Sequence, residues 1–428
     1  QAMMTAVVVR QEVRDMNSFL SGFTWIIAPP DRLTLIRTGH SHRAACANAR
    51  AGVGMVQSLT RDRHTQILIR PWRRAGGCRK FRNNTKPTQM GTPGRARSVA
   101  DRAYPLFISA EASRQALVFA DVIAALRAAY SVPHGPLVSP PRVVTRGQGN
   151  WLRALASSPP GSRYMGAKIF GFGRAKSASY LIALFEQETG ALAALVDGNL
   201  ITAYRTAATS AVAVDRLAPA GPATLGVLGS GLEAQMHVRA IASIRPIAAI
   251  QVFSPTPANR EAFAAGRGSE LGIRCVAVDS AEKAVEGATI VVAAARSRDE
   301  TPILRGRWLR EGMLVVSIGS TLPEQREIDE DVVAACDLIV CDVREEVTEE
   351  TGDMLAAKAA GVAFEHKIVS LNDLMTGAVA DRLAAARRPM YKSIGAAIQD
   401  IVVAELAVNK AIAAGLAQST PLEFLIKH

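Results

Sequence analysis

The sequence has few cysteines, few aromatic residues and no long hydrophobic run. Its 428 residues include 5 cysteines, and Phe, Trp and Tyr together make up 5% of the chain. No apolar stretch approaches the roughly 20 residues that a membrane-spanning helix needs. The first residues also lack the continuous apolar core of a secretory signal. These absences exclude helical membrane proteins and small disulfide-stapled secreted domains, so we expect a soluble, cytoplasmic globular protein.

The sequence also lacks the paired cysteines and histidines of a metal site. The five cysteines, at 46, 78, 275, 336 and 341, form no close-spaced pair of the metal-knuckle kind. His40, His42, Cys46 and His64 have no second close-spaced pair either, so we expect no metal. Cys336 and Cys341 lie in an apolar stretch and are expected to be reduced core residues.

Acidic residues are scarce in the first quarter of the chain only. Residues 1–105 hold 18 Lys and Arg but 5 Asp and Glu. The remainder holds 32 Lys and Arg and 33 Asp and Glu, so it is nearly neutral and the net charge of +12 comes from the first segment. The segment shows no sustained helical or alternating period. We expect a poorly ordered basic extension. Two alternatives stay open, an Arg-rich arm that binds nucleic acid through phosphates and a targeting segment.

From about Leu106 the pattern predicts an α/β fold in two parts. Residues 106–218 read as a short strand, a helix and four strand-like runs, typical of a small α+β domain. Residues 219–388 then alternate apolar strands with helices, which predicts a Rossmann-type doubly wound parallel sheet. Residues 389–428 contain a long amphipathic helix. The six predicted strands are TLGVLG, AAIQVFS, CVAV, ATIVVAAA, MLVVSIG and LIVCD.

The first of these strands runs directly into a glycine turn. Gly229, Gly231 and Ala234 give the spacing GxGxxA between a strand and a helix. Gly229 allows a tight turn, Gly231 lets the backbone approach a pyrophosphate, and a small residue at 234 allows close helix packing. Because the helix N-terminus offers free N–H groups to phosphates, we expect a dinucleotide site here.

The end of the second strand, QVFSPTPANR, has no carboxylate. An NAD site usually places Asp or Glu there to bind the ribose 2′-hydroxyl. Here Ser254 and Thr256 offer hydroxyls, and Arg260 offers a guanidinium suited to a phosphate. We therefore favour NADP(H) over NAD(H).

Six stretches together resemble the ornithine cyclodeaminase and mu-crystallin family. The stretches are PPRVV (140–144), YMGAKIF (164–170), DGNLITAYRTAATSAVAVDRLA (197–218), GVLGSGLEAQ (226–235), VVSIGSTLPEQREID (315–329) and YKSIGAAIQD (391–400). They occur in the family's order over about three quarters of the chain. The resemblance implies a Rossmann domain plus a substrate domain that pairs in a homodimer. It also implies chemistry at an amino or imino carbon beside a carboxylate and a nicotinamide.

The resemblance also implies roles for single residues. Arg142 and Arg205 match the arginines that hold the substrate carboxylate, and Lys168 matches the lysine at the reacting carbon. In a strand-like apolar segment, desolvation would lower the pKa of Lys168 and suit it to proton transfer.

Three further positions near the expected substrate or ring follow from the same resemblance. Ser177 falls near a threonine that contacts the substrate, in a loop of different length. Ser393 and Gly395 match the loop beside the nicotinamide ring, whereas Asp400 is expected to cap or pair within its helix.

One departure from the family decides between its activities. Cyclodeaminases carry an aspartate in the turn after the fifth strand, but here the turn is Gly319-Ser320-Thr321, and we expect Thr321 to face the substrate. Hydride transfer to a preformed imine does not need that acid. We predict an NADP(H)-dependent reductase of small cyclic imino acids such as 1-pyrroline-2-carboxylate. Ornithine cyclodeaminase, an alanine dehydrogenase-like enzyme and a non-enzymatic NADPH-dependent ligand-binding protein remain the alternatives.

Overall fold

The computed structural model describes residues 24–27, 33–36, 58–61, 67–69, 102–297 and 299–426. The first four ranges are strands β1 (Thr24–Ile27), β2 (Leu33–Ile36), β3 (Ser58–Arg61) and β4 (Ile67–Ile69), paired in that order as an antiparallel sheet. The remaining residues before Arg102 lie outside the described part. The basic extension 1–105 therefore stays a prediction.

Eight parallel strands form the predicted doubly wound sheet, in the order β14-β13-β12-β15-β16-β19-β17-β18. The six predicted strands are β12 (Ala223–Leu228), β13 (Ile247–Phe253), β14 (Cys275–Ala277), β15 (Ile290–Ala293), β16 (Leu314–Ser317) and β17 (Leu338–Cys341). The sequence analysis did not identify β18 (Ile368–Ser370) and β19 (Pro389–Lys392). All four residues of β19 are buried, so this short strand shows no alternation that a pattern could reveal. It pairs with β16 and β17, inside the sheet, although the predicted boundary at residue 389 placed it outside.

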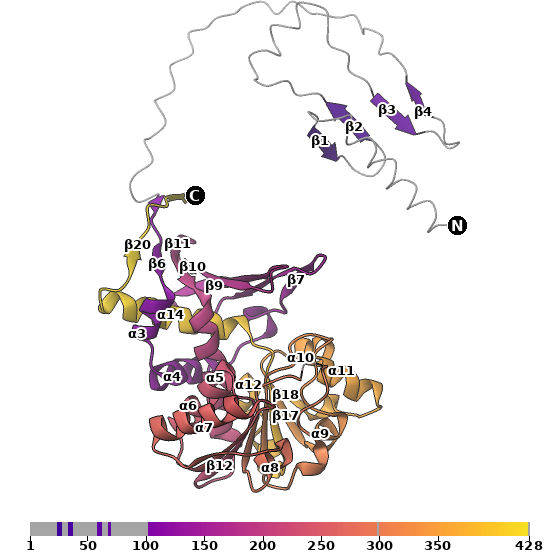
Figure 1. Cartoon of the computed structure of the whole chain (residues 1–428). Helices are drawn as coiled ribbons and strands as arrows, with labels where there is room; N and C mark the ends of the chain where they lie inside the picture. Colours follow the sequence, from indigo (N-terminus) through magenta and orange to yellow (C-terminus); the bar gives the residue numbers. More distant parts are fainter. Residues whose placement is uncertain are drawn as a thin grey trace, which may run out of the picture. The chain divides into compact units, whose positions relative to one another are not determined.

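Both faces of this sheet are covered by helices. Ile290 and Val292 of β15 pack in one core cluster with residues of α5, α6, α7 and α12, whereas Val291 and Ala293 pack in another with residues of α8 to α11. Cys336 and Cys341 are buried free thiols in this second cluster, as predicted. Figure 1 shows α6 and α7 on the left of the sheet and α9 to α11 on its right.

The helices of this part are mostly short. They are α6 (Leu232–Ala242), α7 (Pro257–Leu271), α8 (Ala281–Val285), α9 (Glu330–Ala335), α10 (Arg344–Glu350), α11 (Gly352–Ala359), α12 (Leu371–Thr376) and α13 (Ala380–Ala385). Single 3₁₀ turns cover Pro136–Val138, Gly306–Trp308 and Glu365–Lys367.

The second part is a seven-stranded mixed sheet. Its order is β20 (Gln418–Ser419), β6 (Leu106–Ile108), β11 (Leu192–Asp197), β10 (Ala178–Glu186), β9 (Tyr164–Phe172), β8 (Trp151–Ser157) and β7 (Val143–Arg146). The pairing of β6 with β11 is parallel, and all the others are antiparallel. Beside it, β5 (Arg102–Ala103) pairs with β21 (Phe424–Leu425).

Four helices pack with this sheet: α3 (Ala110–Ala116), α4 (Phe119–Tyr130), α5 (Gly198–Leu217) and α14 (Ala397–Ala413). The single helix predicted after β6 is two, because Leu117 and Val118 take extended conformations between α3 and α4. The side chain of Asp197 caps α5 by accepting a hydrogen bond from the N–H of Asn199 at 3.0 Å. Helices α5 and α14 both contact the mixed sheet and each other.

The alternation of side chains along β8, β9 and β10 sorts them onto two faces. Arg153 on β8 pairs in register with Phe170 on β9, which also pairs with Tyr180 on β10. Leu155 and Lys168 form the next pair along, so these side chains share one face, which we call the inner face. The inner face packs against α14 and carries Arg153, Lys168 and Tyr180.

Candidate active site

A pocket of about 460 Å³ lies between the inner face of the mixed sheet and the carboxyl-terminal edge of the parallel sheet. One side is built by β8, β9, β10 and α5. The other side comes from residues that directly follow β15, β16 and β19, namely Ala294, Ala295, Ile318, Gly319, Ser393, Ile394 and Gly395. Ligands of open parallel sheets bind outside the carboxyl ends of the strands, so this is the expected place for a reaction beside a dinucleotide.

Lys168 is buried in this pocket and paired with an acid. Its side chain is 2% exposed, and Nζ donates to Oδ1 of Asp400 on α14 at 2.7 Å. Burial lowers the pKa of Lys168 to about 7, and the charges of Arg205 and Arg142 act in the same direction, whereas Asp400 acts to raise it. A lysine in this state exchanges protons near neutral pH, as the strand-like apolar sequence around it predicted.

Arg205 on α5 shares the same carboxylate. Its Nε donates to Oδ1 of Asp400 at 3.0 Å, and its Nη1 donates to Gln399 at 3.1 Å. The expectation that Asp400 caps or pairs within its own helix was wrong. Asp400 is fully buried and binds two cations that lie 232 and 195 residues away along the chain. Its Oδ2 is buried with no hydrogen-bond partner among the described residues.

Arg142 also lines the pocket, but most of its guanidinium is engaged. Nε and Nη2 donate to the two carboxylate oxygens of Glu346 on α10 at 2.8 and 2.7 Å. Nη2 also donates to the carbonyl oxygens of Ile394 and Gly395 at 3.0 and 2.6 Å. Glu346 therefore neutralises Arg142, and the two carbonyl groups hold Arg142 at the loop after β19. Of the three guanidinium nitrogens, only Nη1 has no hydrogen-bond acceptor among the described residues.

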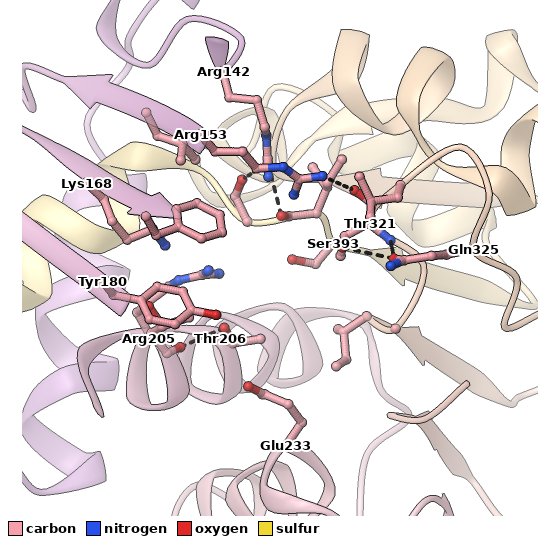
Figure 2. A pocket seen from close by; sticks show the side chains of 18 of the residues that line it. Arg142, Arg153, Lys168, Tyr180, Arg205, Thr206, Glu233, Thr321, Gln325 and Ser393 are labelled. Atoms are coloured by element: carbon pink, nitrogen blue, oxygen red, sulfur yellow. Dashed lines mark hydrogen bonds between the residues drawn. The ribbon is translucent and has the colours of Figure 1, made fainter. Parts of the chain in front are cut away.

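Three charged residues that line the pocket, Arg153, Glu233 and Arg296, were missed by the sequence analysis. Arg153 on β8 is 4% exposed and donates to the carbonyl of Thr321 at 3.3 Å. Glu233, in the first turn of α6, faces the pocket from the side opposite Arg153 (Figure 2), and burial raises its pKa to about 7. An arginine within a strand and a glutamate after a glycine turn carry no spacing signal. Only the fold brings them to the pocket.

The glycine turn has the geometry that a pyrophosphate needs. Gly229 has φ +122°, and a Cβ there would lie 2.8 Å from the carbonyl oxygen of Ala294. A Cβ on Gly231 would meet nothing within 4 Å, so this backbone is open to a ligand. No side chain caps α6, and Ala234 is fully buried against the sheet. The turn and helix thus leave free N–H groups and space for the phosphates of a dinucleotide.

The end of β13 holds the residues predicted to select the cofactor. Ser254 accepts a hydrogen bond from the hydroxyl of Ser230 in the glycine turn at 3.0 Å. Arg260 donates to the carbonyl of Ser254 at 3.0 Å and lies over the ring of Phe253. Thr256 is the N-cap residue of α7, where its side chain makes no capping bond. Hydroxyl and guanidinium groups are therefore gathered beside the glycine turn without a carboxylate.

The loop after β19 borders the pocket and is held by Asp342. Ser393 donates its hydroxyl, and Gly395 its N–H, to Oδ2 of Asp342, both at 2.6 Å. Gly395 has φ +84°, and a Cβ there would lie 2.5 Å from Nη1 of Arg205. Ser177 lies elsewhere. It is exposed in the turn between β9 and β10 and is not among the residues that line the pocket.

A buried polar network supports the other loops of the pocket. Glu327 accepts hydrogen bonds from the N–H groups of Ala295 and Gly319, at 3.0 and 2.9 Å. Lys392, which precedes Ser393, donates to Ser317 at 3.0 Å and to Asp353 at 2.8 Å. Ser317 in turn donates to Glu327 at 2.7 Å. The ends of β15, β16 and β19 are thereby tied together beneath the pocket.

The described part of the chain has neither a metal-binding cluster nor a membrane-spanning helix. No cluster of three or more His, Cys, Asp or Glu side chains is arranged to hold a metal ion. None of the helices has the length and hydrophobicity to cross a membrane.

Sequence comparison matches this chain to one family over most of its length. Residues 106–415 match the ornithine cyclodeaminase/mu-crystallin family. The ketimine reductase mu-crystallin of Mus musculus is 31% identical over 225 residues, which cover 53% of this chain and 67% of that protein. A Delta(1)-pyrroline-2-carboxylate reductase of Bacillus cereus is 28% identical over 245 residues, 57% of this chain and 74% of that protein.

A solved structure agrees with these matches. The Delta(1)-pyrroline-2-carboxylate reductase of Thermococcus litoralis, in complex with NADH and L-proline, superimposes with a TM-score of 0.68 at 28% identity. The superposition covers 74% of this chain and all of that chain.

Proposed function

The chain belongs to the ornithine cyclodeaminase/mu-crystallin family, and from that premise we propose that it is an NADP(H)-dependent reductase of small imino acids, with cyclic imines such as 1-pyrroline-2-carboxylate as test substrates. The observation that carries the proposal is Lys168. It is a buried lysine with a pKa of about 7 that opens onto a pocket at the carboxyl edge of a dinucleotide-binding sheet. Relatives that reduce ketimines and pyrroline-2-carboxylate support the same chemistry.

Four charged groups at the pocket have a part in the proposed reaction. Arg205, and Arg142 through its remaining Nη1, would bind the carboxylate next to the imine carbon. A bound nicotinamide cofactor supplies a hydride to that carbon. Lys168 gives a proton to the imine nitrogen, so that the C=N double bond becomes CH–NH, and it is later reprotonated from solvent. Asp400 holds the ammonium of Lys168 in position and keeps part of it protonated near neutral pH.

The second strand supports NADPH rather than NADH. Ser254 directly follows β13 beside the glycine turn, and the guanidinium of Arg260 reaches it from α7, at a place where a carboxylate would repel a 2′-phosphate. A guanidinium binds a phosphate with two parallel hydrogen bonds, which the ribose hydroxyl of NADH does not offer. We therefore expect a higher kcat/KM with NADPH than with NADH.

The turn after β16 favours reduction over deamination of ornithine. In this turn Thr321 donates its N–H and its hydroxyl to Oε1 of Gln325, at 3.0 and 3.2 Å. No carboxylate stands in the Gly319-Ser320-Thr321 stretch to accept a proton from a substrate amine. A preformed imine does not require one.

We further propose that the protein is a homodimer that pairs through the outer face of the mixed sheet. Val143, Ala154, Ile169 and Leu181 form a row across β7, β8, β9 and β10 on this face. Val143, Ile169 and Leu181 are 71%, 39% and 40% exposed. A continuous apolar row of this kind on a sheet is typical of a protein interface.

The proposal is tested by following NADPH and NADH oxidation with a panel of cyclic imines and of 2-oxo acids plus ammonia. We expect turnover of at least one cyclic imine, faster with NADPH. Failure to reduce every compound, together with release of ammonia from ornithine, would instead identify a cyclodeaminase. Tight binding of NADPH and of an imino acid without any turnover would identify a ligand-binding protein.

A further inference from the structure

Arg153 stands in the pocket on the inner face of β8. Its guanidinium lies 4.9 Å from the centre of the Trp151 ring and 5.9 Å from that of Phe170, and these two rings pack edge to face. The aromatic rings fix the direction of the side chain. In Figure 2 the guanidinium reaches toward Thr321 and Gln325, on the side of the pocket away from Lys168 and Arg205.

The charge of Arg153 is buried without a carboxylate partner. Its Nε is buried and has no hydrogen-bond partner, and the carbonyl of Thr321 at 3.3 Å is the one acceptor that the described residues offer. Burial lowers the pKa of Arg153 to about 10, and the charge of Arg142 acts in the same direction, whereas Glu350 and Glu346, which form no ion pair with Arg153, act to raise it. Removing a guanidinium from water without a counter-charge is unfavourable, so this position lacks an anion.

The other cations of the pocket differ from Arg153 in this respect. Lys168 and Arg205 share Asp400, Arg142 pairs with Glu346, and Arg296 pairs with Glu300. The turn that Arg153 contacts carries Ser320 and Thr321, where an acidic side chain would have supplied a counter-charge. Arg153 is therefore the one lining Lys or Arg that has no carboxylate within ion-pair distance among the described residues.

We propose that Arg153 binds a second carboxylate of the substrate, and hence that the preferred substrates are imino acids with a carboxylate at each end. The inference rests on the proposed function and narrows its substrate class. The cofactor does not supply this anion, because its phosphates belong at the N-terminus of α6 and its nicotinamide ring carries no negative charge. A monocarboxylic imine such as 1-pyrroline-2-carboxylate leaves Arg153 without its partner.

Matched pairs of 2-oxo acids with ammonia isolate the second carboxylate. Oxaloacetate is compared with 2-oxobutyrate, and 2-oxoglutarate with 2-oxovalerate, so that chain length is constant within each pair. In the wild type we expect kcat/KM to be about 10- to 100-fold higher for the dicarboxylic member, as for other charged hydrogen bonds. Arg153→Leu is expected to abolish this ratio, and Arg153→Lys to restore part of it. Arg296→Leu, which removes a lining arginine that is already paired, should leave the ratio as it is.

Two outcomes would overturn the proposal. One is a wild-type ratio near one. The other is an equal loss on both members of a pair in Arg153→Leu, which would place Arg153 at the carboxylate that all substrates share. Calorimetric binding of succinate against butyrate gives a readout that does not need turnover, and succinate should bind more tightly in a manner that requires Arg153. Arg153-dependent binding of succinate without reduction of any imine would contradict the proposed function while supporting this subsite.

Discussion

Lys168 and Asp400 show how a pair from distant parts of the chain sets the chemistry of one atom. Burial lowers the pKa of Lys168, and the carboxylate of Asp400 at 2.7 Å raises it. The balance brings the pKa to about 7. A proton donor is most effective when its pKa lies near the working pH. Asp400 is therefore a positioning residue that acts through Lys168.

The pH dependence follows from this balance. Reduction needs protonated Lys168, so its kcat/KM should fall as pH rises through about 7, whereas oxidation of the amine should rise. Asp400→Asn removes the charge that raises the pKa of Lys168. The fall in kcat/KM for reduction and the rise in kcat/KM for oxidation should therefore both move to lower pH. The measurement is kcat/KM against pH in both directions.

A second carboxyl group in the pocket requires a control for this experiment. Glu233 also has a pKa of about 7, raised by burial. Glu233→Gln should leave the pH dependence of kcat/KM in place if Lys168 causes it. Loss of the pH dependence of kcat/KM in Glu233→Gln, or an unchanged midpoint in Asp400→Asn, would contradict the assignment of this pH dependence to Lys168.

The strands of the parallel sheet were largely predictable, and the pairs that build the pocket were not. Short apolar runs such as TLGVLG are continuous in sequence, so pattern alone locates β12 and its glycine turn. The partners Arg142–Glu346 and Lys168–Asp400 are 204 and 232 residues apart, and no local pattern links them. Lys168 and Arg205 were identified by resemblance, whereas Arg153, Glu233 and Glu346 became visible only once the sheets were packed together.

The buried network under the pocket predicts a large effect on stability. Lys392→Met removes the buried ammonium from the carboxylates of Asp353 and Glu327, and it leaves Asp353 with the more distant Arg326, whose Nε lies 3.6 Å from Oδ1. We expect the free energy of unfolding to fall by about 3–5 kcal/mol, as when one partner of a buried pair is removed.

Urea denaturation measures this effect, with Lys358→Met as the matched control. Lys358 is exposed on α11, so its replacement should change stability by about 0.5 kcal/mol or less. Equal stability of the two variants would show that the network contributes little.

The assembly proposed for the whole molecule depends on one row of apolar residues. Ile169 and Leu181 are directly paired at its centre. Replacing both with glutamate puts two buried charges into each copy of the interface, so light scattering should show a change from dimer to monomer. Leu137→Glu changes a residue that is 90% exposed and lies outside the sheet, and it should leave the mass unchanged. A monomeric wild-type protein would contradict the proposed dimer interface.

We propose that this pocket reduces a C=N bond with Lys168 as the proton donor. The test is the rate of NADPH oxidation with 1-pyrroline-2-carboxylate by the wild type and by Lys168→Met, which keeps an unbranched but slightly shorter side chain and removes the amine. We expect turnover by the wild type and a loss of about 10²- to 10⁴-fold in kcat for the variant, with proline still bound. Reduction by Lys168→Met at the wild-type rate would contradict it.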